Sequence, residues 1–104
     1  MSFFKKILFY LRAGNHQFDS DIWKRFPKNR KLFVKDIVEN EIALGMTKEQ
    51  LVRFFGNDRR EYVDNVWAYP ISVFRDGEIK EMLCFYFDEN NIVNHIKVKY
   101  RRRF

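Results

Sequence analysis

The sequence is poor in the residues that build disulfides, metal centres and catalytic sites. It has 1 Cys, which excludes an intramolecular disulfide and every zinc site made of paired cysteines. His16 and His95 are the only histidines, and no group of His, Cys, Asp or Glu has the spacing of metal ligands. The 4 Gly form no phosphate-binding loop. We therefore expect no catalytic residue, no metal and no cofactor.

Long hydrophobic runs are also scarce near the start of the sequence. The apolar stretch Ile7–Leu11 is shorter than the hydrophobic region of a secretory signal and far shorter than the ~20 residues that cross a bilayer. No small-residue cleavage site or lipid-acceptor cysteine follows it. The sequence thus predicts a cytoplasmic protein, with peripheral contact to a membrane as the alternative.

What the sequence does have is enough apolar residues for one core. Apolar residues make up 46% of the 104 residues, and 12 of them are Phe, which is far more than a disordered chain carries. This length matches one domain of ordinary size. No linker or repeat divides the sequence, so we expect a single domain over residues 1–104.

Positive charge is in excess and collects at both ends. The sequence has 20 Lys and Arg against 14 Asp and Glu, a net charge of +6. The clustered residues are Lys5, Lys6 and Arg12, followed at the other end by Lys97, Lys99, Arg101, Arg102 and Arg103. Such clusters favour anionic partners. The alternative is a solvated surface and a charged strand end that discourages aggregation.

Helical periodicity extends over roughly the first half of the sequence. Apolar residues between Phe3 and Leu11 recur at helical spacing, which predicts a short basic amphipathic helix over 1–14 that packs on the core or lies on a membrane. A helical layer follows over 22–56. It begins with a brief apolar cluster that Pro27 interrupts with a turn, and a long amphipathic helix runs from Lys28 to about Asn40.

A second short helix is predicted from its capping residues. Thr47 and Gln50 have the spacing of a capping box, in which each side chain binds the other's backbone N–H. Gly56 stands where a left-handed residue ends a helix.

The apolar period changes from helix to strand over residues 66–100. Alternating residues from Trp67 to Val73 predict the first strand, Asp76-Gly77 a two-residue hairpin turn, and Asp88–Asn91 a second turn. Three antiparallel strands result. The expected fold is α+β, with two helices packed on one face of a three-stranded antiparallel meander in the order α-α-β-β-β, plus the N-terminal amphipathic helix.

Strand alternation separates a covered face from an open one. We expect the inward residues to be Trp67, Tyr69, Leu83, Phe85, Phe87, Ile96 and Val98, and the outward ones Met82, Cys84, Tyr86, Val93 and His95. An apolar face bordered by charge is typical of an interface. The candidate partner-binding residues are Met82, Tyr86, His95, Lys97 and Lys99. In the alternative, loops or the N-terminal helix cover this face.

One group of motifs resembles a known family. The run Leu44–Val52, then Phe54-Phe55-Gly56, then Trp67–Tyr69 and Phe85–Asp88, is similar to the SmpA/OmlA (BamE-like) domain. That domain is related in architecture to the β-lactamase inhibitor protein. The upstream stretch Trp23-Lys24, with Pro27, Arg30 and Asp36-Ile37, is similar to cytoplasmic relatives of that domain, so the resemblance extends from about Trp23 to Val98. It implies a two-helix layer on a three-stranded sheet, and a role in holding another protein.

These observations lead to one functional hypothesis and one alternative. The first is a non-enzymatic protein-binding module, inhibitor-like or immunity-like, that uses the open sheet face and has no small-molecule substrate. The alternative is a basic peripheral protein that contacts an anionic membrane surface or nucleic acid through its termini. An enzyme is the third and weakest reading, because no acid, base or nucleophile is positioned by any motif.

Overall fold

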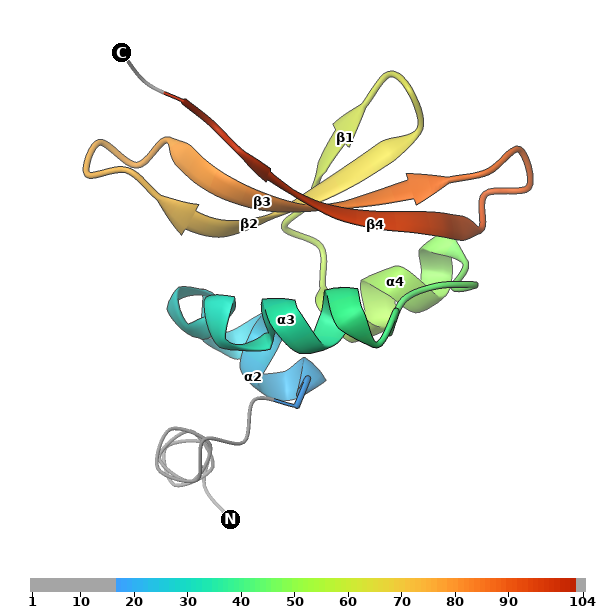
Figure 1. Cartoon of the computed structure of the whole chain (residues 1–104), viewed down its shortest axis with the longest axis horizontal. Helices are drawn as coiled ribbons and strands as arrows, with labels where there is room; N and C mark the ends of the chain where they lie inside the picture. The colour runs from blue at the N-terminus through green and yellow to red at the C-terminus, as the bar shows by residue number, and fades with distance from the viewer. Residues whose placement is uncertain (1–16, 103–104) are drawn as a thin grey trace.

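The computed structural model describes residues 17–102, and within them three α-helices precede a four-stranded antiparallel sheet. The elements are α2 (Ser20–Arg25), the 3-10 turn η1 (Pro27–Asn29), α3 (Lys31–Glu39), α4 (Lys48–Phe55), β1 (Arg60–Tyr62), β2 (Val66–Val73), β3 (Ile79–Phe87) and β4 (Val93–Tyr100). The helices gather on one face of the sheet (Figure 1). The predicted α+β class is confirmed, and the helix predicted over 1–14 lies outside the described residues.

The helical layer contains one helix more than the sequence predicts. The cluster before Pro27 forms α2, where the Asp19 carboxylate accepts the N–H of Ile22 at 3.0 Å and caps the first turn. Six residues are too few for a helical period to be read from the sequence. The predicted turn at Pro27 is η1, so the long helix begins at Lys31 rather than Lys28. No helix within residues 17–102 is long and apolar enough to span a bilayer.

The capping box of α4 is confirmed. The Thr47 hydroxyl accepts the Gln50 N–H at 3.1 Å, and the Gln50 side chain accepts the Thr47 N–H at 3.0 Å. Gly56 has the positive φ expected of it, 93°, but its ψ of −168° is extended rather than left-handed helical. The chain therefore leaves α4 in a direction that only glycine adopts without strain.

Side chains of α2 bind the free carbonyl groups at the end of α4. Ser20 Oγ donates to Phe54 O at 2.6 Å, and Trp23 Nε1 donates to Phe55 O at 3.0 Å. Lys24 Nζ donates to Arg53 O at 3.0 Å. The last carbonyls of a helix have no partner inside it. These bonds therefore satisfy the end of α4 and fix α2 against it.

The sheet has the strand order β1-β2-β3-β4, so the predicted three-stranded meander gains β1 at one edge. All three residues of β1 are exposed and show no apolar alternation, which left the strand without a sequence signal. The predicted hairpin turn at Asp76-Gly77 is also longer than expected. Phe74 N–H bonds to Glu78 O at 2.7 Å, which leaves a three-residue loop in which Gly77 has a φ of 88°.

The core lies between the helices and the inner face of the sheet. Its fully or nearly buried residues are Ile22, Trp23, Phe33, Ile37, Ala43, Leu51, Phe55, Trp67, Tyr69, Ile71, Leu83, Phe85, Phe87 and Val93. The predicted inward residues Ile96 and Val98 are half-buried and pack against this cluster. Val93 was predicted to point outward, and this is wrong. An irregularity between Tyr86 and Phe87 shifts the register so that Val93 pairs with Phe87 and is buried in the core.

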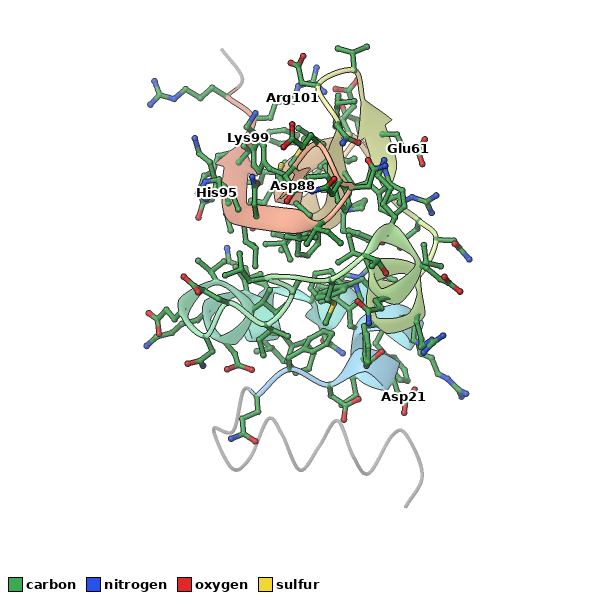
Figure 2. The ribbon with its side chains drawn as sticks, turned by 90° about the vertical axis from the view of Figure 1, so that its right-hand side faces the viewer. Asp21, Glu61, Asp88, His95, Lys99 and Arg101 are labelled. Carbon is green, nitrogen blue, oxygen red and sulfur yellow. The ribbon has the colours of Figure 1, made fainter. Side chains whose placement is uncertain are left out.

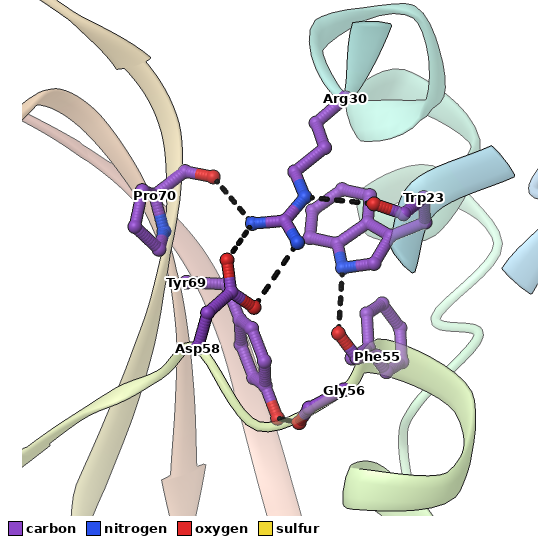
Figure 3. Close-up of polar contacts among 7 residues, drawn as sticks. All are labelled: Trp23, Arg30, Phe55, Gly56, Asp58, Tyr69 and Pro70. Atoms are coloured by element: carbon purple, nitrogen blue, oxygen red, sulfur yellow. Dashed lines mark hydrogen bonds and ion pairs between the residues drawn. The ribbon is translucent and has the colours of Figure 1, made fainter. Parts of the chain in front are cut away.

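A buried arginine connects the helical layer to the sheet (Figure 3). Arg30 is 1% exposed and binds both carboxylate oxygens of Asp58 at 2.7 and 3.0 Å. It also donates to Trp23 O at 3.0 Å and to Pro70 O at 3.1 Å. Its guanidinium carbon lies 4.7 Å from the centre of the Trp23 ring. One side chain thus joins α2, the loop after α4 and β2.

Tyr69 makes a second link in the same region. Its hydroxyl donates to Gly56 O at 2.9 Å, which ties β2 to the residue that ends α4 (Figure 3). Burial raises the pKa of the Tyr69 phenol well above its ordinary value. The hydroxyl therefore stays protonated and keeps its donor across the physiological pH range.

We predict that Arg30→Ala lowers the free energy of unfolding by about 2–4 kcal/mol, because it leaves the carbonyl groups of Trp23 and Pro70 without their donor and empties a buried site, while the Asp58 side chain is 49% exposed and regains water. Urea unfolding measures the change. Lys28→Ala, which alters an exposed cation of the neighbouring turn, is the control and should stay within about 0.5 kcal/mol of the unaltered chain. A loss below about 1 kcal/mol in Arg30→Ala would show that the cluster does not hold the layers together.

Candidate functional site

The outer face of the sheet, on the side away from the helices, carries three rows of side chains fixed by strand register. Successive rows are Tyr62, Val66, Tyr86 and His95; then Arg60, Ala68, Cys84 and Lys97; then Pro70, Met82 and Lys99. The apolar middle of each row comes from β2 and β3, and the basic side chains come from the two edge strands. All five predicted partner-binding residues, Met82, Tyr86, His95, Lys97 and Lys99, therefore share this outer face.

The hairpin of β1 and β2 projects from the sheet on the side away from the helices (Figure 1), and a hollow lies between β1 and β3 on the outer face. This hollow has a volume of about 440 Å³. It is lined by Tyr62, Val63, Asp64, Val66, Met82, Cys84, Tyr86 and Lys99. The Tyr62 hydroxyl approaches the Met82 sulfur at 3.9 Å across the hollow. A β1 side chain therefore forms the wall opposite β3.

A second hollow of about 310 Å³ continues the first along β1. It shares Tyr62 and Met82 with the first hollow and adds polar residues, among them Arg60, Glu78 and Arg101. The two hollows together form a groove, which we call the outer groove. One part of the outer groove is mainly apolar, and the other is mainly polar.

Basic side chains border the outer groove along β4. In Figure 2, His95 and Lys99 lie along β4 on the sheet side of the molecule, while Asp21 lies in the helical layer beneath. The His95 and Tyr86 rings are 5.3 Å apart, and Lys99 Nζ lies 5.9 Å from the centre of the Tyr86 ring. Interaction with the Tyr86 hydroxyl raises the pKa of Lys99, so this amine is charged at neutral pH. Within residues 17–102, neither Lys97 nor Lys99 forms an ion pair.

Cys84 lies at the floor of the apolar hollow and is 1% exposed. Burial raises the pKa of its thiol, while the charges of Lys99 and Lys97 act in the opposite direction. Burial is the larger effect, so the thiol is protonated at neutral pH. A protonated and buried thiol behaves as a small apolar side chain rather than as a nucleophile.

The structure places part of the predicted anionic-surface set. Lys5, Lys6, Arg12 and Arg103 lie outside the described residues. Arg101 and Arg102 are exposed beyond the end of β4, and Arg101 forms an ion pair with Glu78 at 2.5 Å. Arg101 therefore has an acidic partner, whereas Lys97 and Lys99 have none among the described residues.

Sequence reasoning missed the residues of β1 and its turn that build the far wall of the outer groove. Tyr62 is 45% exposed, and Val63 is fully exposed at the turn between β1 and β2. The only sequence signal was two adjacent apolar residues among charged ones, which resembles an ordinary loop. An exposed Tyr-Val pair on a projecting turn becomes recognisable as a contact surface only once its position across the hollow from β3 is known.

Other parts of the described chain offer fewer candidate binding sites. Among residues 17–102, no three His, Cys, Asp or Glu side chains lie close enough to hold a metal ion. A separate hollow of about 390 Å³ lies between η1 and β2 and is lined by Pro27, Lys28, Pro70, Ile71, Ser72 and Val73. Lys28 is its single charged residue, so the outer groove is the richer candidate.

Comparison of the chain with protein-family models, with curated proteins and with solved structures found no match. The resemblance to the SmpA/OmlA domain thus remains a prediction from the motifs. The case for function accordingly rests on the geometry of the outer face.

We predict that Cys84 in the folded protein reacts with iodoacetamide at neutral pH at least about tenfold more slowly than in the urea-unfolded chain, because its raised pKa and burial both lower the reactive thiolate. The ratio between the two reaction rates should decrease as the pH rises toward the pKa of Cys84 in the folded protein. Lys99→Gln removes a charge that lowers this pKa, so it should slow the reaction further. Equal rates of reaction for the folded and unfolded chains at neutral pH would contradict a buried Cys84 thiol with a raised pKa.

Proposed function

We propose that this protein is a non-enzymatic protein-binding module whose outer face receives an acidic region of a partner protein. The observation that carries the proposal is the position of Lys97 and Lys99 beside an apolar hollow lined by Met82, Cys84 and Tyr86. Neither lysine has an ion-pair partner within residues 17–102. Apolar centres bordered by charge are the usual composition of protein interfaces.

Each part of the outer face has a distinct role in this proposal. The hollow of about 440 Å³ receives an apolar or aromatic side chain of the partner, and Tyr62 and Tyr86 contact it from opposite walls. Tyrosine is enriched at energetically important interface positions because its ring is large and its hydroxyl stays hydrated. Lys97 and Lys99 pair with carboxylates beside that anchor, which favours acidic partners and speeds their association.

The resemblance of the motifs to the SmpA/OmlA domain supports the same proposal, because it implies a role in holding another protein. An inhibitor-like or immunity-like role agrees with a groove that holds a partner without transforming it. The alternative is contact with an anionic membrane or nucleic acid through the basic termini. That alternative is tested by the same experiment, since contact through the termini predicts no protein cross-linked at Tyr86.

We predict that a photo-crosslinking amino acid at Tyr86 captures a partner protein, whereas the same amino acid at Lys35, exposed on α3, does not. Lys97→Glu should reduce the cross-linked yield about tenfold, because attraction to a partner carboxylate becomes repulsion. Lys35→Glu makes the same change of charge away from the outer face and should leave the yield unchanged.

Two outcomes would overturn the proposal. Equal capture from Tyr86 and Lys35 would mean that the outer face is not selective. Absence of any cross-linked protein at Tyr86, with binding of nucleic acid or lipid to the chain that weakens as the salt concentration rises, would favour the basic termini instead, because screening weakens such contacts.

A further inference from the structure

We propose that the free edge of β4 binds an extended segment of the partner as an added antiparallel strand with alternating acidic and apolar side chains. This inference rests on the proposed protein-binding role and names the conformation and chemistry of what is bound. β4 is the last strand in the order β1-β2-β3-β4, so one of its edges has no neighbouring strand in the described chain. Exposed strand edges are established sites for the addition of a strand.

The hydrogen-bond pattern identifies which β4 residues face this edge. Arg101 N–H donates to Lys80 O of β3 at 2.8 Å. Backbone groups in an antiparallel pair point toward and away from the partner strand at alternate residues. Counting back from Arg101, the backbone groups of Lys99, Lys97 and His95 point toward β3. Those of Ile96, Val98 and Tyr100 point toward the free edge.

The chain itself already pairs with the beginning of this edge. Gly45 N–H donates to Val93 O at 2.9 Å, and Val93 N–H donates to Met46 O at 2.9 Å. Thr47 and Ile92 form an antiparallel bridge next to them. This segment stops before Ile96, so a partner strand would continue the same line of hydrogen bonds along β4.

The two sides of β4 determine the sequence pattern of the added strand. On the inner side, Ile96 and Val98 are half-buried against the core, and α3 lies beneath β4 in both views (Figures 1 and 2). On the outer side, His95, Lys97 and Lys99 are exposed. Side chains that neighbour one another across strands interact directly. Apolar residues of the partner therefore belong beside Ile96 and Val98, and acidic residues belong beside the two lysines.

Charge argues against a second copy of this chain as the occupant. Antiparallel pairing of two β4 strands would bring Lys97 and Lys99 of one copy beside those of the other on the same outer side. Like charges on neighbouring strands oppose pairing. The net charge of +6 adds to the repulsion.

The test uses the full-length protein and a labelled peptide of alternating Glu and Val residues. A peptide of the same composition, with all Glu placed before all Val, is the control. Nuclear magnetic resonance follows amide hydrogen exchange at each β4 residue. We expect the alternating peptide to slow exchange at Ile96, Val98 and Tyr100. Exchange at Lys97 and Lys99 should stay unchanged, because those amides already bond to β3.

A proline substitution tests the edge hydrogen bonds directly. Tyr100→Pro removes an N–H that points toward the free edge and leaves every bond to β3 intact, and proline is tolerated on edge strands. Tyr100→Ala removes the same side chain, which is 68% exposed, and keeps the N–H. We expect the peptide to bind Tyr100→Pro about tenfold more weakly than Tyr100→Ala.

The outcomes separate this inference from the proposed function. Peptide binding that perturbs Met82 and Tyr86 without slowing edge exchange would overturn the added strand and leave the outer-face role standing. Failure of the alternating peptide to bind, or equal binding of both peptides, would also overturn it. Exchange that slows with rising protein concentration and no peptide would identify a second copy as the occupant instead. Slower amide exchange at Ile96, Val98 and Tyr100, without any cross-link from Tyr86, would support the added strand and count against binding in the outer groove.

Discussion

The arrangement of this protein depends on the buried guanidinium of Arg30. Removing a guanidinium from water is costly, and the cost is offset only when its donors are bound in good geometry. Here two donors bind the Asp58 carboxylate and the remaining bonds go to the carbonyl groups of Trp23 and Pro70. These partners belong to α2, the loop after α4 and β2. Their convergence on one side chain fixes the helices on the inner face of the sheet.

Fixing the helices on one face decides what the other face can do. The aromatic core around Phe55, Tyr69 and Phe85 is packed on the inner side, with ring centres 4.9 to 5.8 Å apart. The outer side is left to shorter side chains over β2 and to basic residues at its edges. No described helix covers this face, and at its centre Val66, Ala68 and Cys84 form a small buried cluster against which Met82 and Tyr86 pack. The function we propose is thus a consequence of one-sided packing.

Much of this arrangement follows from the sequence, and the exceptions have physical reasons. The capping box at Thr47, the change of period near residue 66 and the outward position of Met82 and Tyr86 were all predicted correctly, because each rests on local spacing. β1 was missed because its pairing with β2 depends on the fold rather than on its own residues. Val93 was misplaced because a one-residue irregularity in register reverses which face a side chain occupies.

The candidate site was predicted less completely than the fold for the same reason. The alternation of residues along β3 and β4 correctly predicted that their outward residues share one face, because both strands are long and alternate regularly. The far wall of the outer groove comes from Tyr62, whose neighbours give no periodic signal. The salt bridge of Arg30 with Asp58 was also beyond the sequence. Its two residues are 28 positions apart. The sequence alone does not distinguish a buried arginine from an exposed one.

The proposed function requires the outer face of the sheet to be accessible to solvent and to a partner in the intact protein. Hydroxyl-radical labelling followed by mass spectrometry tests it by comparing tyrosines within one chain. We expect rapid labelling of the exposed Tyr62, slower but clear labelling of the half-buried Tyr86, and strong protection of Tyr69, which is fully buried on the inner face. Protection of Tyr86 as strong as that of Tyr69 would mean that another part of the chain covers the outer face, and it would rule out binding of a partner there.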